Sequence, residues 1–312
     1  MANKRILVGA MLGLVGLTLV LALILPVGRE ARESGRDAPA GTVGVIRIEG
    51  VIMGEPGGGW MSEPGNVQTI MSELRSAQRD EAVRSVVIRI NSPGGSSAAA
   101  QEIVKEVQRL RQSGKKVVVS MGDVAASAGY WIAAPADTIV ANPSTLTGSI
   151  GVIMMWQNFE QLLNKLGIDS EVVKSGPYKD IGSPVRAPSD TEKEMLQGIV
   201  DDTYRQFLDD LIKYRTGKIS PEKLAEVADG RVLTGRQAYD LGLVDEMGNF
   251  YDAVQLAGRL AGIEGEPELK EYTAATPWER FFSRLAGSLS SHPTINMLEN
   301  QWRLLPGEGV SR

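Results

Sequence analysis

The 312-residue sequence contains no cysteine and a single histidine. The lack of cysteine excludes disulfides, thiolate metal sites and cysteine nucleophiles. The histidine, His292, lies near the C-terminus in a stretch that contains serine and proline, where we expect a solvated loop residue. One histidine cannot build a multi-histidine metal site, so nucleophilic catalysis is limited to serine, threonine, lysine or a carboxylate.

An excess of positive charge is also missing, because the formal net charge is −5. Nucleic acid is therefore not an expected partner. The glycine-rich stretch Gly54–Gly59 lacks the Lys-Ser/Thr ending of a phosphate-binding loop, and we interpret it as a turn or flap. With 43% hydrophobic residues, the chain can bury a full core in one or two domains.

One long uncharged run is present at the N-terminus. Residues 6–25 carry no charge and follow a short head, residues 1–5, that ends in Lys4 and Arg5. About 20 apolar residues at about 1.5 Å rise cross a bilayer core of about 30 Å. The alternative is a cleaved secretory signal, whose apolar region of about 7–15 residues ends at a small-x-small site. Residues 26–30 offer no such site, so the run predicts an uncleaved transmembrane anchor.

The orientation of this anchor does not follow from counting charges, because more basic residues follow the run than precede it. A short head leading directly into a long apolar run is typical of a segment that exports the chain after it. We therefore expect the folded domain on the extracytoplasmic side of the cell membrane. Residues 26–41, which are charged and poor in apolar side chains, are interpreted as a linker.

Beyond the linker, runs rich in β-branched residues alternate with a helical pattern. Strands are predicted at Thr42–Val51, Ser85–Ile90, Lys116–Ser120 and Thr138–Ala141, and a helix at Ser97–Ser113. This alternation predicts an α/β domain with buried parallel strands.

The second half of the chain is predicted to be mainly helical. Trp156–Leu166 has an amphipathic pattern, Asp169–Lys174 resembles a short strand, and Asp190–Thr216 is a long helix. Ser220 and Thr234 are the expected N-caps of two further short helices.

A serine hydroxyl needs a neighbouring base, and neutral lysine can serve as one. Lysine normally titrates near pH ~10.4, so lowering its pKa by about three units requires about 4 kcal/mol of desolvation. Ser127 is a candidate nucleophile, because it lies among small residues in Met121–Trp131 (MGDVAASAGYW) after a predicted strand. At a helix N-terminus it would face amides that favour negative charge. The alternative is an ordinary N-cap serine with alanines for close packing.

Two further segments contain candidate site residues. In Asn91–Gly95 (NSPGG), paired glycines after a strand expose amides that can form an oxyanion hole, although an ordinary turn would look the same. Lys174–Ile181 (KSGPYKDI) offers Lys174 or Lys179 as the base, and composition does not choose between them. An exposed loop lysine is the default expectation, and a carboxylate at Asp180 close to Lys179 would keep that lysine protonated.

Five motifs in one order resemble the signal peptide peptidase A family of membrane-bound serine peptidases, related in fold to ClpP and the crotonases. They are the strand–NSPGG–helix unit, MGDVAASAGYWIAAPAD, TLTGSIGV, KSGPYKD and ADGRVLTGRQAYDLGLVDEMG, between about Val43 and Asp252. The resemblance implies a ClpP/crotonase-like α/β fold of repeated β-β-α units, preceded by a single transmembrane helix. It matches the short form, with one peptidase domain at residues 42–265.

The resemblance also implies roles for individual residues. Ser127 matches the nucleophile and Lys179 the general base, which decides against the other lysine of that segment. The amides of Gly95 and Ala128 match the oxyanion hole, and Ser149 matches a serine that orients the lysine. Many family members have glycine at the position of Ala128, but a backbone N–H is present with either residue.

Family resemblance further implies a ring-shaped homo-oligomer resting on the membrane, with the dyad completed within or between protomers. The implied substrates are remnant signal peptides or other extended apolar peptides, bound by strand addition. No cofactor or metal is expected. Residues 266–312 form a predicted tail with aromatic residues at helical spacing, either amphipathic or loosely ordered.

Two other functions remain open on the same fold. A crotonase-like acyl-CoA enzyme would need a carboxylate at the site, and Asp123 is the candidate in that segment. A non-catalytic membrane scaffold would need neither the serine nor the lysine.

Overall fold

Parallel strands form the centre of the domain. In the computed structural model, which describes residues 41–54 and 66–272, β1 (Thr42–Glu49), β2 (Val83–Ser92) and β3 (Lys116–Ala126) pair in parallel. Runs such as Val86–Ile88 in β2 are buried on both faces of the sheet, as expected of parallel strands covered by helices. The predicted strands are confirmed here, and β3 extends beyond Ser120 to the residue before Ser127.

The described part of the sheet has eight strands in one layer. Its main path runs β6 (Val232–Thr234), β5 (Leu146–Gly148), β3, β2, β1, β8 (Glu268–Tyr272), and only the β5–β6 pair is antiparallel. The short strands β4 (Thr138–Ala141) and β7 (Glu246–Met247) continue the sheet from the first half of β3. Because β8 pairs with β1, the sheet includes residues beyond 265 that the sequence had suggested were tail.

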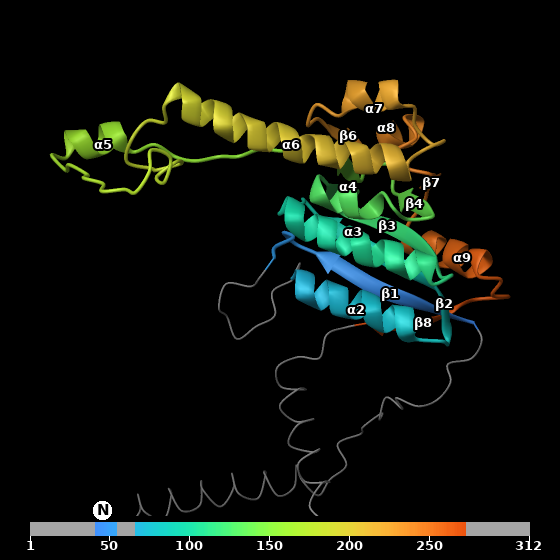
Figure 1. Cartoon of the computed structure of the whole chain (residues 1–312). Coiled ribbons are helices and arrows are strands. Elements are labelled where there is room, and N and C mark those ends of the chain that lie inside the picture. The colour runs from blue at the N-terminus through green and yellow to red at the C-terminus, as the bar shows by residue number, and fades with distance from the viewer. Residues whose placement is uncertain (1–40, 55–65, 273–312) are drawn as a thin grey trace, which may run out of the picture. The chain divides into compact units, whose positions relative to one another are not determined.

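Helices cover both faces of this sheet (Figure 1). On one face lie α2 (Val67–Arg79), α3 (Ser97–Gln112) and the fully buried α4 (Ala128–Ala133), and on the other lies α9 (Phe250–Leu260). Helix α3 is confirmed almost residue for residue, whereas α2 was not predicted. Among the described elements, β1, β2, β3, β6 and β7 are each followed by one helix, whereas β4 and β5 are consecutive, so the implied β-β-α unit is not the general repeat.

Two of the later helices begin at the predicted caps, and the long helix begins at its predicted first residue. Helix α6 (Asp190–Tyr214) starts with a capping box at Ser189 and buries Phe207 and Leu211 near its other end. Ser220 and Thr234 accept backbone hydrogen bonds at the starts of α7 (Pro221–Val227) and α8 (Gly235–Asp240).

The segment between β5 and α6 projects from the sheet (Figure 1). Its one helix, α5 (Glu160–Lys165), buries no residue, and apolar side chains such as Met155, Leu166 and Val173 are exposed. The strand predicted at Asp169–Lys174 is wrong, because no neighbouring strand in the described chain pairs with this segment. An unpaired strand leaves its amides and carbonyls without ladder partners.

The predicted anchor at residues 6–25 and most of the predicted tail lie outside the described residues, as do His292 and residues 55–59 of the glycine-rich stretch. Within residues 41–54 and 66–272, no helix combines the length and apolarity needed to cross a bilayer.

Candidate active site

Ser127 occupies the turn between β3 and α4. Its backbone is left-handed, with φ 54° and ψ −120°, a conformation that costs a non-glycine residue about 1–3 kcal/mol. Its amide donates to the carbonyl of Gly148 and its carbonyl accepts from Trp131, both at 2.9 Å. Ser127 precedes α4 as an N-cap, yet its hydroxyl makes no capping bond. The strained, half-buried turn therefore presents a hydroxyl that the helix does not use.

Small residues on all sides allow this turn. A Cβ added at Gly94 would lie 2.8 Å from the Ser127 Cβ, and one at Gly129 would lie 3.1 Å from the Ser92 carbonyl oxygen. The small residues of NSPGG and of the segment around Ser127 thus have one common role. They allow the loop after β2 to approach the start of α4 closely.

The loop after β2 places backbone donors next to the turn. It is held by Ile52, whose amide donates to the Gly94 carbonyl and whose carbonyl accepts from Ser96, both at 2.9 Å. Between these bonds, the Gly95 amide has no acceptor among the described residues. The Ala128 amide is the first of α4 and has no intrahelical partner, and it lies 3.1 Å from where a Gly94 Cβ would be. Two free N–H groups thus lie on the two segments that meet at the Ser127 turn, and free amides of this kind can hold an oxyanion.

Ser149 lies at the end of the neighbouring strand. Ala126 of β3 pairs with Gly148 of β5, so Ser127 and Ser149 are the next residues of two parallel strands. Ser149 is the other non-glycine residue with positive φ in the described chain, at 50°, and its amide donates to the Arg231 carbonyl at 2.8 Å. The sheet thus places Ser127 level with Ser149, and the loop that contains Gly94 and Gly95 approaches the same turn.

Lys179 is not brought to this cluster. It lies in the projecting segment with an exposed side chain, and no hydrogen bond or ion pair of its ammonium is found within the described residues. The other candidate, Lys174, is occupied, since its ammonium contacts the Asp180 carboxylate at 2.6 Å and the Pro177 carbonyl at 2.9 Å. Asp180 therefore pairs with Lys174 and not with Lys179, although it follows Lys179 directly in the sequence. The expectation that Asp180 would keep Lys179 protonated is not supported by a contact between them.

Arg186, which the sequence analysis did not single out, bridges two carboxylates in the same segment. Its guanidinium donates to both Asp180 oxygens at 2.8 and 2.9 Å, and to Glu192 at the start of α6. Hydrogen bonds from Arg186, and then from Lys174, hold the pKa of Asp180 well below its usual range. Hydrogen bonds from Arg186, and then from the Ser189 amide, lower the pKa of Glu192 to about 2. No spacing signal in SPVRAP points to this role.

Helix α6 is attached to the helix that follows the nucleophile. The ring of Phe207 stacks on Trp131 of α4 with centroids 4.3 Å apart, and the Trp131 indole donates to Asp210 at 2.8 Å. The segment between β5 and α6, which contains Lys179, contacts Glu192 at the start of α6 through Arg186. The other end of α6 packs on α4, so a single helix connects this Lys179 segment to the helix that begins at the Ser127 turn.

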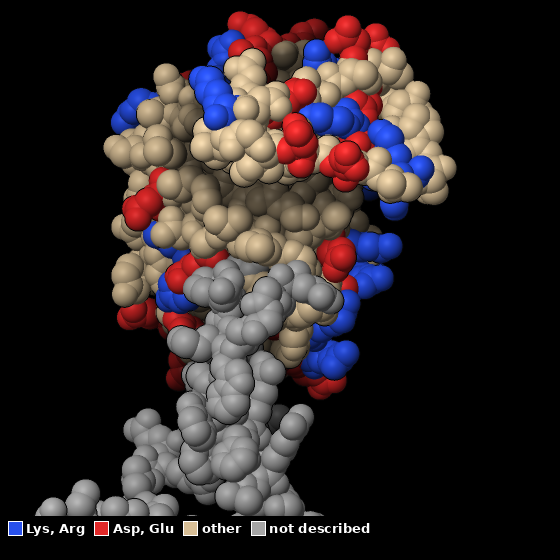
Figure 2. Space-filling model, turned by 90° about the vertical axis from the view of Figure 1, so that its left-hand side faces the viewer, with Lys and Arg blue, Asp and Glu red and all other residues tan. Residues whose placement is uncertain are grey.

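A pocket of about 540 Å³ lies beside the loop that carries Gly95. It is lined by Ser96, Ser97 and Gln101, by residues 152–154, and by α6 residues that include Ile199 and Thr203, all of them uncharged. Figure 2, seen from the left-hand side of Figure 1, shows an uncharged hollow across the middle of this face.

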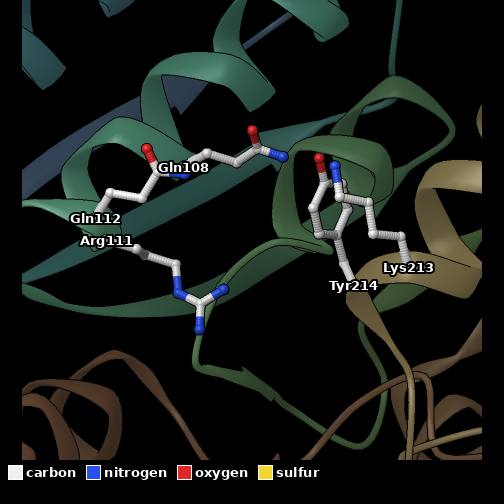
Figure 3. A pocket seen from close by; sticks show the side chains of 5 residues that line it. All are labelled: Gln108, Arg111, Gln112, Lys213 and Tyr214. Atoms are coloured by element: carbon white, nitrogen blue, oxygen red, sulfur yellow. The ribbon is translucent and has the colours of Figure 1, made fainter.

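A second pocket, of about 360 Å³, lies near the far end of α3. There Lys213 and Tyr214 of α6 lie side by side, opposite Gln108 and Arg111 (Figure 3). Arg111 is already paired with Asp137 at 2.6 Å, and none of these groups belongs to the serine cluster.

Asp123, the carboxylate that acyl-CoA chemistry would need, is exposed and makes no hydrogen bond to Ser127. The structure therefore offers no carboxylate partner for the Ser127 hydroxyl in the described residues.

Comparison with known proteins points to a family of peptidases. The family model "Peptidase family S49" matches residues 109–264, and the model "Clp protease" matches residues 62–145. "Protease 4" of Salmonella typhi is 43% identical over 72% of this chain, and a "Putative protease" of Synechocystis sp. is 39% identical over 74%. The "Putative signal peptide peptidase SppA" of Enterococcus faecium is 33% identical over 81%.

These alignments cover 81% and 80% of the Synechocystis and Enterococcus proteins but 35% of the Salmonella protein. The chain thus spans about a third of the length of the Salmonella relative. With the mixed α/β, ClpP-like fold and the serine turn in place, these matches establish that the chain belongs to the serine peptidase family S49.

Proposed function

We propose that this protein is a membrane-anchored serine endopeptidase in which Ser127 is the nucleophile and Lys179 the general base. The observation that carries the proposal is the left-handed Ser127 turn, whose hydroxyl does not cap α4 and which the loop of Gly94 and Gly95 approaches closely. A strained backbone of this kind persists only where the surroundings enforce it, and such residues cluster at active sites.

The proposed reaction is acyl transfer. Neutral Lys179 takes the Ser127 proton as the hydroxyl attacks the peptide carbonyl, and the two amides hold the resulting oxyanion. Collapse of the tetrahedral intermediate breaks the C–N bond, and the protonated lysine gives its proton to the leaving amine. Water, deprotonated by the same lysine, then hydrolyses the acyl-enzyme and releases Ser127.

We propose that Lys179 comes from a second copy of the chain in a homo-oligomer. Lysine loses its charge at neutral pH only when it is shielded from water, and in the single chain Lys179 is exposed. The same segment exposes Ile153 (85%), Met155 (82%) and Val173 (104%). Exposed apolar side chains in this density mark an interaction surface. A neighbouring protomer that covers them would shield the ammonium at the same time.

The proposed substrates are extended apolar peptides, including remnant signal peptides. The uncharged pocket beside Gly95 suits an apolar side chain, and the Enterococcus relative is named as a signal peptide peptidase. The predicted anchor at residues 6–25 would hold the domain at the extracytoplasmic membrane surface, where such peptides remain.

The test is cleavage of a synthetic signal peptide by the full-length protein in detergent, followed by mass spectrometry. Ser127→Ala and Lys179→Ala are each expected to abolish cleavage without changing oligomer size. If the dyad is shared between copies, mixing the two inactive variants during assembly restores part of the activity. Intact cleavage by Ser127→Ala would remove that residue from the mechanism, and no cleavage by an assembled wild type would favour a scaffold.

A further inference from the structure

The Lys179 segment has an uneven charge arrangement. Lys174 and Arg186 both contact the Asp180 carboxylate, at 2.6 Å and 2.8 Å, whereas Lys179, next to Asp180 in sequence, contacts none. Asp180 is 14% exposed at the side chain, so its partners enclose it. The Asp180 carboxylate is thus shared by Lys174 and Arg186, whereas Lys179 has no carboxylate partner in the described chain.

Arg186 holds the Asp180 carboxylate in place because its guanidinium also binds Glu192. One side of its guanidinium holds Asp180 and the other holds Glu192, which is 4% exposed and closes the capping box of α6. Bidentate guanidinium–carboxylate pairs are directional, so Arg186 fixes the direction in which the Asp180 carboxylate points.

Two other carboxylates near this loop are also engaged. Glu160 of α5 accepts from the Ala187 amide at 2.9 Å, and Asp190 in the first turn of α6 pairs with Lys193 at 2.9 Å. Neither carboxylate contacts Lys179. Among the described residues, Asp180 is the acid that adjoins Lys179 in sequence, and without Arg186 only the contact from Lys174 would hold its carboxylate.

We propose that Arg186 is a positioning residue that withholds the Asp180 carboxylate from Lys179, so that Lys179 can give up its proton and act as a base. This inference rests on the proposed function. A free carboxylate close to an ammonium stabilises the charged form, and only the neutral amine accepts the Ser127 proton. Loss of Arg186 would therefore move the onset of activity to higher pH.

The experiment measures labelling of Ser127 by a fluorophosphonate as a function of pH, using the full-length oligomer in detergent. The proteins are wild type, R186Q, D180N and the double variant R186Q/D180N, with R205Q as control. Arg205 makes an exposed pair 3.7 Å from Asp202 on α6. We expect R186Q to shift the labelling midpoint upward by about one pH unit. In the double variant the midpoint returns to the wild-type value, because the released carboxylate is gone, and R205Q leaves it unchanged.

A purely structural role of Arg186 predicts a different result. R186Q would then lower labelling at every pH without moving the midpoint, and D180N would not repair it. Either finding, in the presence of normal wild-type labelling, overturns the inference and leaves the proposed function intact. If wild type is not labelled, or if Ser127→Ala is labelled equally, the proposed function fails and the inference with it.

Discussion

The backbone amide of Ser127 donates to the carbonyl oxygen of Gly148 at 2.9 Å, so the end of β3 is locked to the end of β5. This bond continues the pairing of Ala126 with Gly148 and leaves Ser127 and Ser149 side by side at the same sheet edge. Both serines have positive φ, so the backbone turns directly after β3 and directly after β5 at matching positions of the sheet.

Glycine at position 127 should relieve the strain of the turn. We expect Ser127→Gly to be more stable than Ser127→Ala by about 1 kcal/mol, because glycine adopts positive φ without steric cost. Both variants should lose peptide hydrolysis. Urea unfolding of the two proteins checks the difference, and equal stability would mean that this backbone is not strained.

Gly94→Ala should disturb the nucleophile directly. The added Cβ would lie 2.8 Å from the Ser127 Cβ and 3.0 Å from the Ala126 carbonyl oxygen, at φ +110°. We expect a loss of about 2 kcal/mol or more in stability and at least roughly tenfold in kcat.

The matched control is Gly114→Ala, which also has positive φ, at +91°, but meets nothing within 4 Å. It should cost about 1 kcal/mol from the backbone alone and leave kcat unchanged. Equal effects of the two substitutions on kcat would contradict the proposed crowding at Ser127.

Ser149→Gly separates the hydroxyl from the backbone at this position. Glycine suits φ 50°, so the variant should be as stable as wild type or slightly more so. If the hydroxyl orients the lysine, kcat should still fall roughly tenfold or more, with KM little changed. Steady-state kinetics on a fluorogenic peptide measures this, and unchanged kcat would restrict Ser149 to a structural role.

Asp245 should be important for stability. It accepts two hydrogen bonds from Arg215, both at 2.9 Å, and the two side chains are 7% and 1% exposed. Although burial opposes it, the Arg215 guanidinium keeps the pKa of Asp245 below its usual value. Because Asp245→Ala leaves a buried guanidinium unpaired, we expect a loss of about 3 kcal/mol or more on urea unfolding.

Asp202→Ala is the control, since its pair with Arg205 is exposed, and it should cost about 0.5 kcal/mol or less. A similarly small effect of Asp245→Ala would show that the Arg215 site rehydrates.

The Arg186–Glu192 contact should make stability depend on pH in the acid range. The pKa of Glu192 is lowered from 4.5 to about 2, chiefly by Arg186, so its carboxylate favours the folded state above about pH 4.5. That contribution is lost as the pH falls toward about 2. The melting temperatures of wild type and Glu192→Gln should therefore differ at neutral pH and converge below about pH 4.5. A difference that stays constant down to about pH 2 would contradict the shift.

The regular elements of the domain follow largely from local sequence. Apolar periodicity is sufficient to place β4 and α3, and side-chain capping to place the starts of α7 and α8. Helix α2 was missed although Val67, Ile70, Met71 and Leu74 have helical spacing and are buried. The strand expected at Asp169–Lys174 fails for the opposite reason, because β-branched composition cannot supply a pairing partner.

The sequence alone determined the chemistry available to this protein: no thiol, a single histidine near the C-terminus, and a serine set among small residues after a predicted strand. Only the tertiary structure decided the left-handed turn of Ser127, the two bonds of Ile52 that hold the loop of Gly95, and the pairing of Asp180 with Lys174 and Arg186. The physical reason is that periodicity and capping act over a few residues. Strand register and shared ion pairs depend instead on groups that the fold brings together from distant parts of the chain.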